Sequence, residues 1–401
     1  MKAGRPCLWC GKTLPNDTHS TQKTCNHEEG LLYRSKKIAE SNAKRLATLA
    51  EANIVASDAH EIDLRSACQR LTRDLAEAKA SKAELIRAID QAASAAMAGL
   101  VIPPVPAPAI DKRKKTPEIA VAVLSDWQLG KRTPTYDSTV CEQRIEEYGR
   151  RVLKLTEIQR ADHPVKELRI YMLGDIVEGE LIFPGQSWRI DASLFQQVLI
   201  DGPRILGSFV RRMAGAFEKV RVVGVIGNHG SLGGRARKEY HPESNADAML
   251  YEVTRQVLLP EPRVEWLATR ERLERKWYAV DQVGDRKFFL FHGDQVKGGF
   301  AGFPWYGFGK KLMGWRTIAD LLKSSGISEP FDYALSGHFH TPVRTYINGI
   351  THWGSGSPES TNTYAAEELA SAGEPCQWLL FVHPKHGVTA EYLVHLAARE
   401  K

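Results

Sequence analysis

Side chains that bind metal ions recur at intervals along the last two thirds of the chain. They are Asp126, Gln128, Asp175, Asn228, His229, His292, His338 and His340. A mixed set of carboxylate, carboxamide and imidazole groups suits borderline divalent ions such as manganese, iron or zinc better than calcium. Two such ions about 3.5–4 Å apart can clamp a phosphate group between them. These residue types therefore indicate a metal centre that acts on phosphate.

Short apolar runs with the character of β-strands precede these side chains. The runs are 119–124, 168–173, 220–226, 288–291 and 333–335, and each ends directly in a polar cluster. The first run is continuously apolar, as expected of a strand buried on both faces. In open α/β sheets, ligand sites form at the C-terminal ends of strands. We therefore expect five loops to converge on one site, in a catalytic domain over residues 118–395.

The ordered motifs SDWQLG, GDIVEG, GNHG, FHGD and GHFH resemble those of the calcineurin-like metallophosphoesterase superfamily. The pair GNH and GHxH is the most specific part of this resemblance. It implies an α/β fold, in the form of a four-layer α/β/β/α sandwich with a dinuclear centre. The segments IFPGQSWRID (182–191) and GNHGSLGGRARK (227–238) also resemble catalytic proteins encoded by bacteriophages and prophages.

The resemblance implies a role for each candidate ligand. The first metal ion would be bound by Asp126, Gln128 and His340, and the second by Asn228, His292 and His338. Asp175 would bridge the two ions. His229 would hydrogen-bond the phosphate or protonate the leaving oxygen.

The chain departs from the family pattern at two positions. Gln128 stands where the family usually has histidine. A weaker or harder first site is therefore expected, with manganese preferred and iron or zinc as alternatives. Gly230 stands where an acidic residue is common, so another group must orient His229. Glu178 is either that partner or a solvated loop residue.

Basic and aromatic residues follow the motifs. The candidate substrate contacts are Lys131, Arg132, Arg235, Arg237 and Lys297. Such cations around the metal ions would neutralise several phosphates of a polymer. The aromatic residues either stack unpaired bases or pack in a core; they are Trp127, Trp188, Phe300, Phe303, Trp305, Tyr306, Phe308 and Trp315. Interspersed glycines predict a mobile flap over residues 300–310.

Residues 1–30 resemble a small zinc ribbon. The expected ligands of a structural zinc ion are Cys7, Cys10, Cys25 and His27, with His19 as an alternative fourth ligand. The spacing Cys7-x2-Cys10 is typical of a zinc knuckle. Free thiols or a decayed site are the alternative reading.

The composition of the chain predicts a helical segment over residues 31–100, followed by a linker over residues 101–117. Between 31 and 98 there is neither glycine nor proline, and an apolar heptad seam runs from Leu64 to Ala96. We expect a coiled coil that forms a hairpin or a homo-oligomer; a helix packed on its own domain is the alternative. Pro103, Pro104, Pro106 and Pro108 stiffen the 101–117 linker, and the basic run 112–115 follows them.

The overall composition of the chain is that of a globular protein. The chain has 401 residues, 43% hydrophobic and 25% charged, with a formal net charge of +6. No stretch approaches the roughly 20 apolar residues of a membrane span, so we expect a cytoplasmic protein of a bacterial or phage-infected cell. The leading hypothesis is a DNA nuclease or phosphoesterase. The alternatives are a small-molecule nucleotide phosphodiesterase or pyrophosphatase, and a non-catalytic nucleic-acid-binding protein that kept the fold.

Overall fold

The computed structural model describes residues 6–8, 12, 35–44, 104–233, 244–267, 277–298, 302–321, 330–359 and 373–397. The chain divides into two compact units, Met1–Arg87 and Ala88–Lys401. In the first unit, residues 35–44 are helical. Cys7 is buried, and its backbone N–H donates to the carbonyl of Lys12 at 2.7 Å. Cys10, Cys25, His27 and the heptad seam lie outside the described residues, so the zinc site and the coiled coil stay predictions.

The second unit contains two β-sheets. The strands are β1 (Glu118–Leu124), β2 (Val165–Met172), β3 (Lys219–Gly224), β4 (Val264–Trp266), β5 (Tyr278–Val283), β6 (Arg286–Phe291), β7 (Tyr333–Ser336), β8 (Val343–Ile347), β9 (Ile350–Gly354), β10 (Cys376–His383) and β11 (Gly387–His395). One sheet has the order β11-β10-β1-β2-β3-β4, and the other has the order β5-β6-β7-β9-β8. All five strands expected from the sequence are present, as β1, β2, β3, β6 and β7.

Parallel pairing brings the ends of the motif strands together. β1, β2 and β3 are consecutive parallel neighbours in the six-stranded sheet. β6 and β7 are parallel neighbours in the five-stranded sheet. The C-terminal ends of parallel neighbours lie at the same edge of a sheet. Each sheet therefore delivers its motif loops to one edge, as the sequence predicts.

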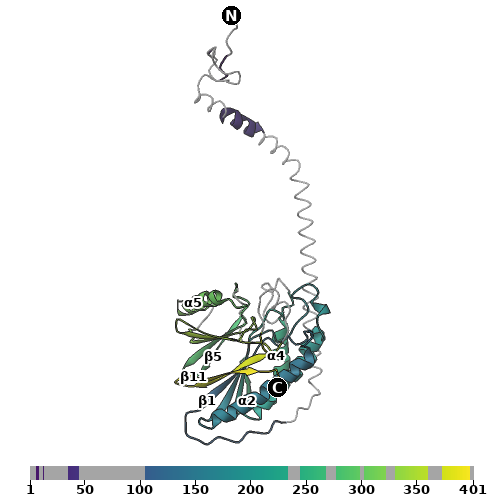
Figure 1. Cartoon of the computed structure of the whole chain (residues 1–401), viewed down its shortest axis with the longest axis vertical. Helices are drawn as coiled ribbons and strands as arrows, with labels where there is room; N and C mark the ends of the chain where they lie inside the picture. Colours follow the sequence, from purple (N-terminus) through teal and green to yellow (C-terminus); the bar gives the residue numbers. More distant parts are fainter. Residues whose placement is uncertain are drawn as a thin grey trace. The chain divides into compact units, whose positions relative to one another are not determined.

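Helices cover the outer faces of the sheets. They are α2 (Ser138–Arg160), α3 (Gly202–Ala214), α4 (Ala246–Val257) and α5 (Trp305–Leu321), with a 3-10 turn at Gln186–Trp188 and a π-helical turn at Gln196–Asp201. Figure 1 shows α5 on one side of the sheets and α2 and α4 on the other. The predicted mixed α/β class with two sheets is confirmed.

Three hydrophobic cores follow from the alternation of side chains along the strands. Ala120, Ala122 and Leu124 of β1 pack with residues of α2, α3 and α4. Val121 and Val123, on the opposite face, share a core with residues of β6. A third core joins the other face of β6 to α5. β1 is thus buried on both faces, which explains its continuously apolar sequence.

The segment expected to be a flap is partly helical. α5 begins at Trp305, and Phe308 in its first turns is buried in the third core. Residues 305–310 therefore form the start of a helix that is anchored by Phe308, and the mobility of the flap stays a prediction.

The described part of the linker, residues 104–117, lacks regular structure up to β1, as its prolines predict. Two cations of its basic run contact carboxylates: Arg113 pairs with Asp111, and Lys115 pairs with Asp162 at 2.5 Å. In the described part of the chain, no helix is both long enough and apolar enough to cross a membrane.

Candidate metal centre

Five candidate ligands share an unusual backbone conformation. The φ angles are 53° at Asp126, 46° at Gln128, 52° at Asp175, 74° at His338 and 52° at His340. In the described residues, Asn348 is the one other non-glycine residue with positive φ. This conformation costs a non-glycine residue about 1–3 kcal/mol and persists only where the surroundings enforce it. Such strain is concentrated at functional sites, so the backbone alone marks these loops as a site.

Close packing of the loops enforces the strain. The pairing of β1 with β2 continues past the strand ends, since the N–H of Gln128 donates to the carbonyl of Asp175 at 2.9 Å. A Cβ atom at Gly227 would lie 2.0 Å from Oδ1 of Asp175, and one at Gly337 would lie 2.4 Å from Oδ2 of Asp126. Only glycine permits this approach. The motif glycines therefore bring the carboxylates of neighbouring loops to the centre.

One half of the centre gathers four of the expected ligands. Nε2 of His292 lies 3.0 Å from Oδ2 of Asp175, 3.1 Å from Oδ1 of Asn228 and 3.2 Å from Nδ1 of His338. Ligand atoms of Asp175, His292 and His338 all lie within 4.8 Å of one another. Nδ1 of His292 donates to the carbonyl of Leu173 at 2.7 Å. That bond leaves Nε2 as the nitrogen available for a metal ion.

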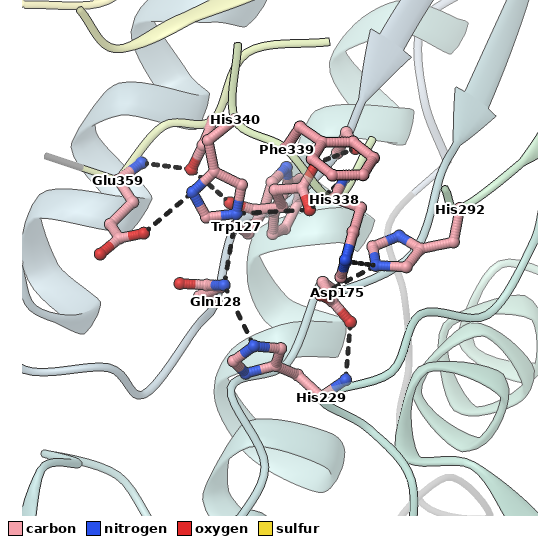
Figure 2. A network of polar contacts seen from close by, with 12 residues as sticks. Trp127, Gln128, Asp175, His229, His292, His338, Phe339, His340 and Glu359 are labelled. Carbon is pink, nitrogen blue, oxygen red and sulfur yellow. Dashed lines mark hydrogen bonds and ion pairs between the residues drawn. The ribbon is translucent and has the colours of Figure 1, made fainter. Parts of the chain in front are cut away.

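The other half contains Asp126, Gln128 and His340. Nε2 of His340 lies 3.5 Å from Oδ1 of Asp126 and 3.3 Å from Nε2 of Gln128. Nδ1 of His340 contacts Oε2 of Glu359 at 3.1 Å (Figure 2). The backbone N–H of His338 donates to both carboxylate oxygens of Asp126 at 3.0 Å. This bond ties the two halves together.

His229 lies at the border of the two halves. Its backbone N–H donates to Oδ1 of Asp175 at 2.7 Å, and its Nε2 lies 3.5 Å from Nε2 of Gln128. Its Nδ1 lies 3.1 Å from Oε2 of Glu178, which is 1% exposed. Gln186 donates to the other carboxylate oxygen of Glu178 at 3.0 Å. Glu178 is therefore the buried partner of His229, and the solvated reading of Glu178 is wrong.

The titration behaviour of His292 and His340 reflects the carboxylates beside them. Burial by itself would lower the pKa of His292, but Asp175 outweighs burial and raises that pKa to about 10. For His340, burial is likewise outweighed by Asp126 and Glu359, and its pKa rises to about 10. Carboxylates that hold protons on neighbouring imidazoles create a negative potential. Such a potential favours a cation, whose binding releases these protons.

Asp247 is a structural anchor that the sequence analysis missed. Its buried carboxylate accepts four backbone N–H groups, from Asp175 at 2.9 Å, Ile176 at 3.0 Å, Val177 at 3.1 Å and Gly227 at 2.8 Å. It thereby joins the loops after β2 and β3. An acidic residue in the first turn of a helix is common, so nothing in its local sequence indicates that Asp247 reaches the centre.

Glu359 was missed for a different reason. It lies in the segment after β9, 231 residues along the chain from Gln128, and it contacts both His340 and Lys131. Its sequence context, SPES, carries no motif. Only long-range packing brings its carboxylate to the site.

The expected substrate contacts are distributed unevenly. Lys131 lies within the centre, whereas Arg132 and Lys297 are exposed. Arg235 and Arg237 lie outside the described residues. Among the aromatic candidates, Trp127, Phe303, Phe308 and Trp315 are buried, so core packing is the alternative that holds for these rings. Trp188, Trp305 and Tyr306 are exposed.

Comparisons with known proteins find distant likenesses among solved structures. No family model and no curated protein sequence matches the chain. A hypothetical protein from Pyrococcus horikoshii is 11% identical, with 70% of this chain and 90% of that chain covered and a TM-score of 0.34. Vacuolar Protein Sorting 29 from Cryptosporidium parvum is 15% identical, with coverage of 69% and 98% and a TM-score of 0.32. Yfce, a phosphoesterase from E. coli, is 12% identical, with coverage of 69% and 100% and a TM-score of 0.28.

Proposed function

We propose that the chain is a metal-dependent phosphoesterase with the four-layer architecture of the calcineurin-like superfamily, and that it hydrolyses phosphodiester bonds in nucleic acid, DNA in particular. One observation carries the hydrolytic part of the proposal. Loops from separate strands bring carboxylate, carboxamide and imidazole groups to one centre, and most of these ligands have strained backbones. Backbone strain of this kind lowers the stability of the fold, so its concentration at these residues indicates a role in positioning them.

The donors of the centre fit a divalent cation. Three of them, in Asp175, His292 and His338, lie within mutual reach, and the carboxylates supply negative charge. The mixture of oxygen and nitrogen donors favours manganese, with iron or zinc as alternatives. When bound, the ion would neutralise phosphoryl oxygens and acidify a water molecule.

His229 has the position of a general acid. Glu178 engages Nδ1, so Nε2 is the nitrogen that faces the centre. Burial alone would lower the pKa of His229, but Asp175 and Glu178 outweigh burial and raise that pKa to about 9. The imidazole is therefore protonated at neutral pH and can donate a proton from Nε2 to the leaving oxygen. Glu178 stabilises the protonated ring and fixes its orientation.

An exposed aromatic loop beside the centre supports a nucleic-acid substrate. In the 181–195 loop, Trp188 is 89% exposed and Phe195 is 58% exposed. The carbonyl of Arg189 accepts the N–H of Arg132 at 2.9 Å, and Lys131 and Ile190 form a β-bridge. The loop is thereby attached to the segment that carries Gln128. Exposed rings next to a phosphate site suit stacking on unpaired bases.

Gln186 couples the same loop to the general acid. Its side-chain amide donates to both the backbone carbonyl and the carboxylate of Glu178, at 2.8 and 3.0 Å. Trp188 is two residues away, in the same 3-10 turn. A base that stacks on Trp188 would therefore be held by the loop that also orients His229.

Hydrolysis assays with manganese-loaded protein test the proposal. The substrates are labelled single- and double-stranded DNA and RNA, bis-p-nitrophenyl phosphate and a panel of nucleotides. We expect cleavage of DNA with steep inhibition by salt, because a polymer contact releases several counterions. Cleavage of nucleotides alone, with a shallow salt dependence, would favour the small-molecule alternative. Absence of hydrolysis with every substrate would leave the non-catalytic alternative.

A substitution in the aromatic loop tests the polymer contact directly. Trp188→Ala should lower kcat/KM on single-stranded DNA by roughly 5- to 150-fold, since stacking on an aromatic ring is worth about 1–3 kcal/mol per base. Hydrolysis of bis-p-nitrophenyl phosphate should be unchanged. Tyr346→Ala is the matched control, because Tyr346 is an exposed ring on β8 of the other sheet. Equal effects of the two substitutions on DNA would contradict a role for the loop.

A further inference from the structure

The half of the centre that contains Gln128 also contains a fixed cation. Nζ of Lys131 lies 2.5 Å from Oε1 of Glu359 and 2.8 Å from Oε1 of Gln128. The Lys131 side chain is 17% exposed, and that of Glu359 is 1% exposed. The backbone N–H of Lys131 donates to the carbonyl of Gln128 at 2.9 Å, in a turn that passes through Gly130 at a φ of 98°. This turn folds the ammonium group back onto the carboxamide.

The chemistry of lysine determines how Gln128 is oriented. An ammonium group has three donors and no acceptor, so the atom of Gln128 that faces Lys131 must be the oxygen. The amide nitrogen then points into the centre, 3.3 Å from Nε2 of His340 and 3.5 Å from Nε2 of His229. Figure 2 shows Gln128 between these two rings. A carboxamide NH2 group donates hydrogen bonds and does not bind a cation.

The two halves therefore differ in their capacity for metal ions. In one half, Nε2 of His292 lies 3.0–3.2 Å from oxygen or nitrogen atoms of Asp175, Asn228 and His338. These four side chains together can surround one cation. Of the expected ligands, the Gln128 half keeps Asp126 and His340 as its own. Its ammonium group adds a like charge that repels a second cation, most strongly where water is excluded.

We propose that the centre binds one divalent ion tightly, through Asp175, Asn228, His292 and His338, and that the Lys131 ammonium supplies the positive charge of the second ion. This inference rests on the proposed function. Glu359 holds Lys131 with one carboxylate oxygen and His340 with the other. Lys131 donates a hydrogen bond to a non-bridging oxygen of the bound phosphate, and Glu359 is the positioning residue for that contact.

Metal binding to the substrate-free protein tests the inference. Isothermal titration with MnCl2, with elemental analysis after dialysis, should give one tight ion per wild-type chain and a second ion that binds at least ~100-fold more weakly. In Lys131→Met, the affinity for the second ion should rise by roughly 10- to 100-fold, the scale on which neighbouring groups tune metal sites. Lys385→Met is the control, because Lys385 is exposed in the turn between β10 and β11 and should leave both affinities unchanged.

The double variant Lys131→Met with Gln128→His should complete the second site. We expect two manganese ions per chain and the electron paramagnetic resonance signal of a spin-coupled pair, which the wild type should lack. Thermal unfolding of each variant checks that the fold is retained. Should the double variant not fold, the single variant Lys131→Met and its control still decide the outcome.

The outcomes separate this inference from the proposed function. Two ions of similar affinity in the active wild type, with no change in Lys131→Met, would overturn the inference and leave the hydrolytic function in place. One tight ion without hydrolysis of any phosphodiester would overturn the proposed function. A wild type that takes up no manganese would overturn both.

Discussion

Two buried clusters of charged side chains in the second unit are built in opposite ways. One is the candidate metal centre. The other lies between the two sheets, where Asp281 of β5 accepts hydrogen bonds from the Tyr171 hydroxyl at 2.8 Å and from Arg221 at 3.0 Å. A guanidinium nitrogen of Arg169 lies 3.5 Å from the same carboxylate. We call this second cluster the inter-sheet network.

The two clusters differ in their backbone conformation and in the basic side chains that pair with their carboxylates. The network residues belong to regular strands, whereas most candidate ligands of the centre lie in loops with positive φ. The network pairs a carboxylate with guanidinium groups, which are always charged and bind no metal ion. The centre pairs carboxylates with imidazoles, which can lose a proton and then bind a metal ion. Burial of charge therefore does not by itself identify a functional site.

The largest expected effect comes from the carboxylate at the middle of the centre. Asp175→Asn should reduce hydrolysis of bis-p-nitrophenyl phosphate to background, because the change removes the charge of an expected metal ligand. The loss of activity should exceed the ~100-fold that is typical when a residue supporting a metal ligand is replaced. The circular dichroism spectrum should stay that of the parent. Asp285→Asn, at an exposed position between β5 and β6, is the control and should retain full activity. Parental turnover by Asp175→Asn would show that the centre is not catalytic.

A smaller effect, on pH dependence, is expected at Glu178. The protonated form of His229 is the acid, so kcat/KM should fall as the pH rises through the pKa of His229. Because the Glu178 carboxylate raises that pKa, Glu178→Gln should lower it and move the alkaline limb to lower pH by roughly 1–3 units. Glu157→Gln, on the exposed face of α2, should leave the profile in place. An alkaline limb at the same pH in Glu178→Gln and the parent would rule out His229 as the acid.

The smallest effect on turnover is expected in the inter-sheet network. Asp281→Ala leaves Arg169 and Arg221 without their shared carboxylate and should lower the free energy of unfolding by about 3–5 kcal/mol. Urea denaturation followed by tryptophan fluorescence measures this loss. The kcat of the folded variant should equal that of the parent, and Asp285→Ala should change stability by less than about 0.5 kcal/mol. A selective loss of kcat in Asp281→Ala would remove the distinction between the two clusters.

The strands and the polar side chains at their ends could be predicted because their signals are local. An apolar run that ends in Gly-Asp or Gly-Asn-His reports a buried strand and the side chain at its end, and neither depends on distant residues. The aromatic residues show where such reasoning stops. Trp127 and Trp188 have the same side chain, yet one is 0% exposed and the other is 89% exposed. Their packing environments, which local sequence does not specify, set the difference.

The sequence by itself determined which groups are available to bind metal ions, and their order along the strands of the sheets. The tertiary structure decided which charges surround them: that Asp247 joins two loops, that Glu178 pairs with His229, and that Glu359 holds Lys131 against Gln128. The physical reason is the length of chain between partners. Strand pairing and core packing set distances between residues far apart in the chain, and an interaction between buried charges depends steeply on those distances.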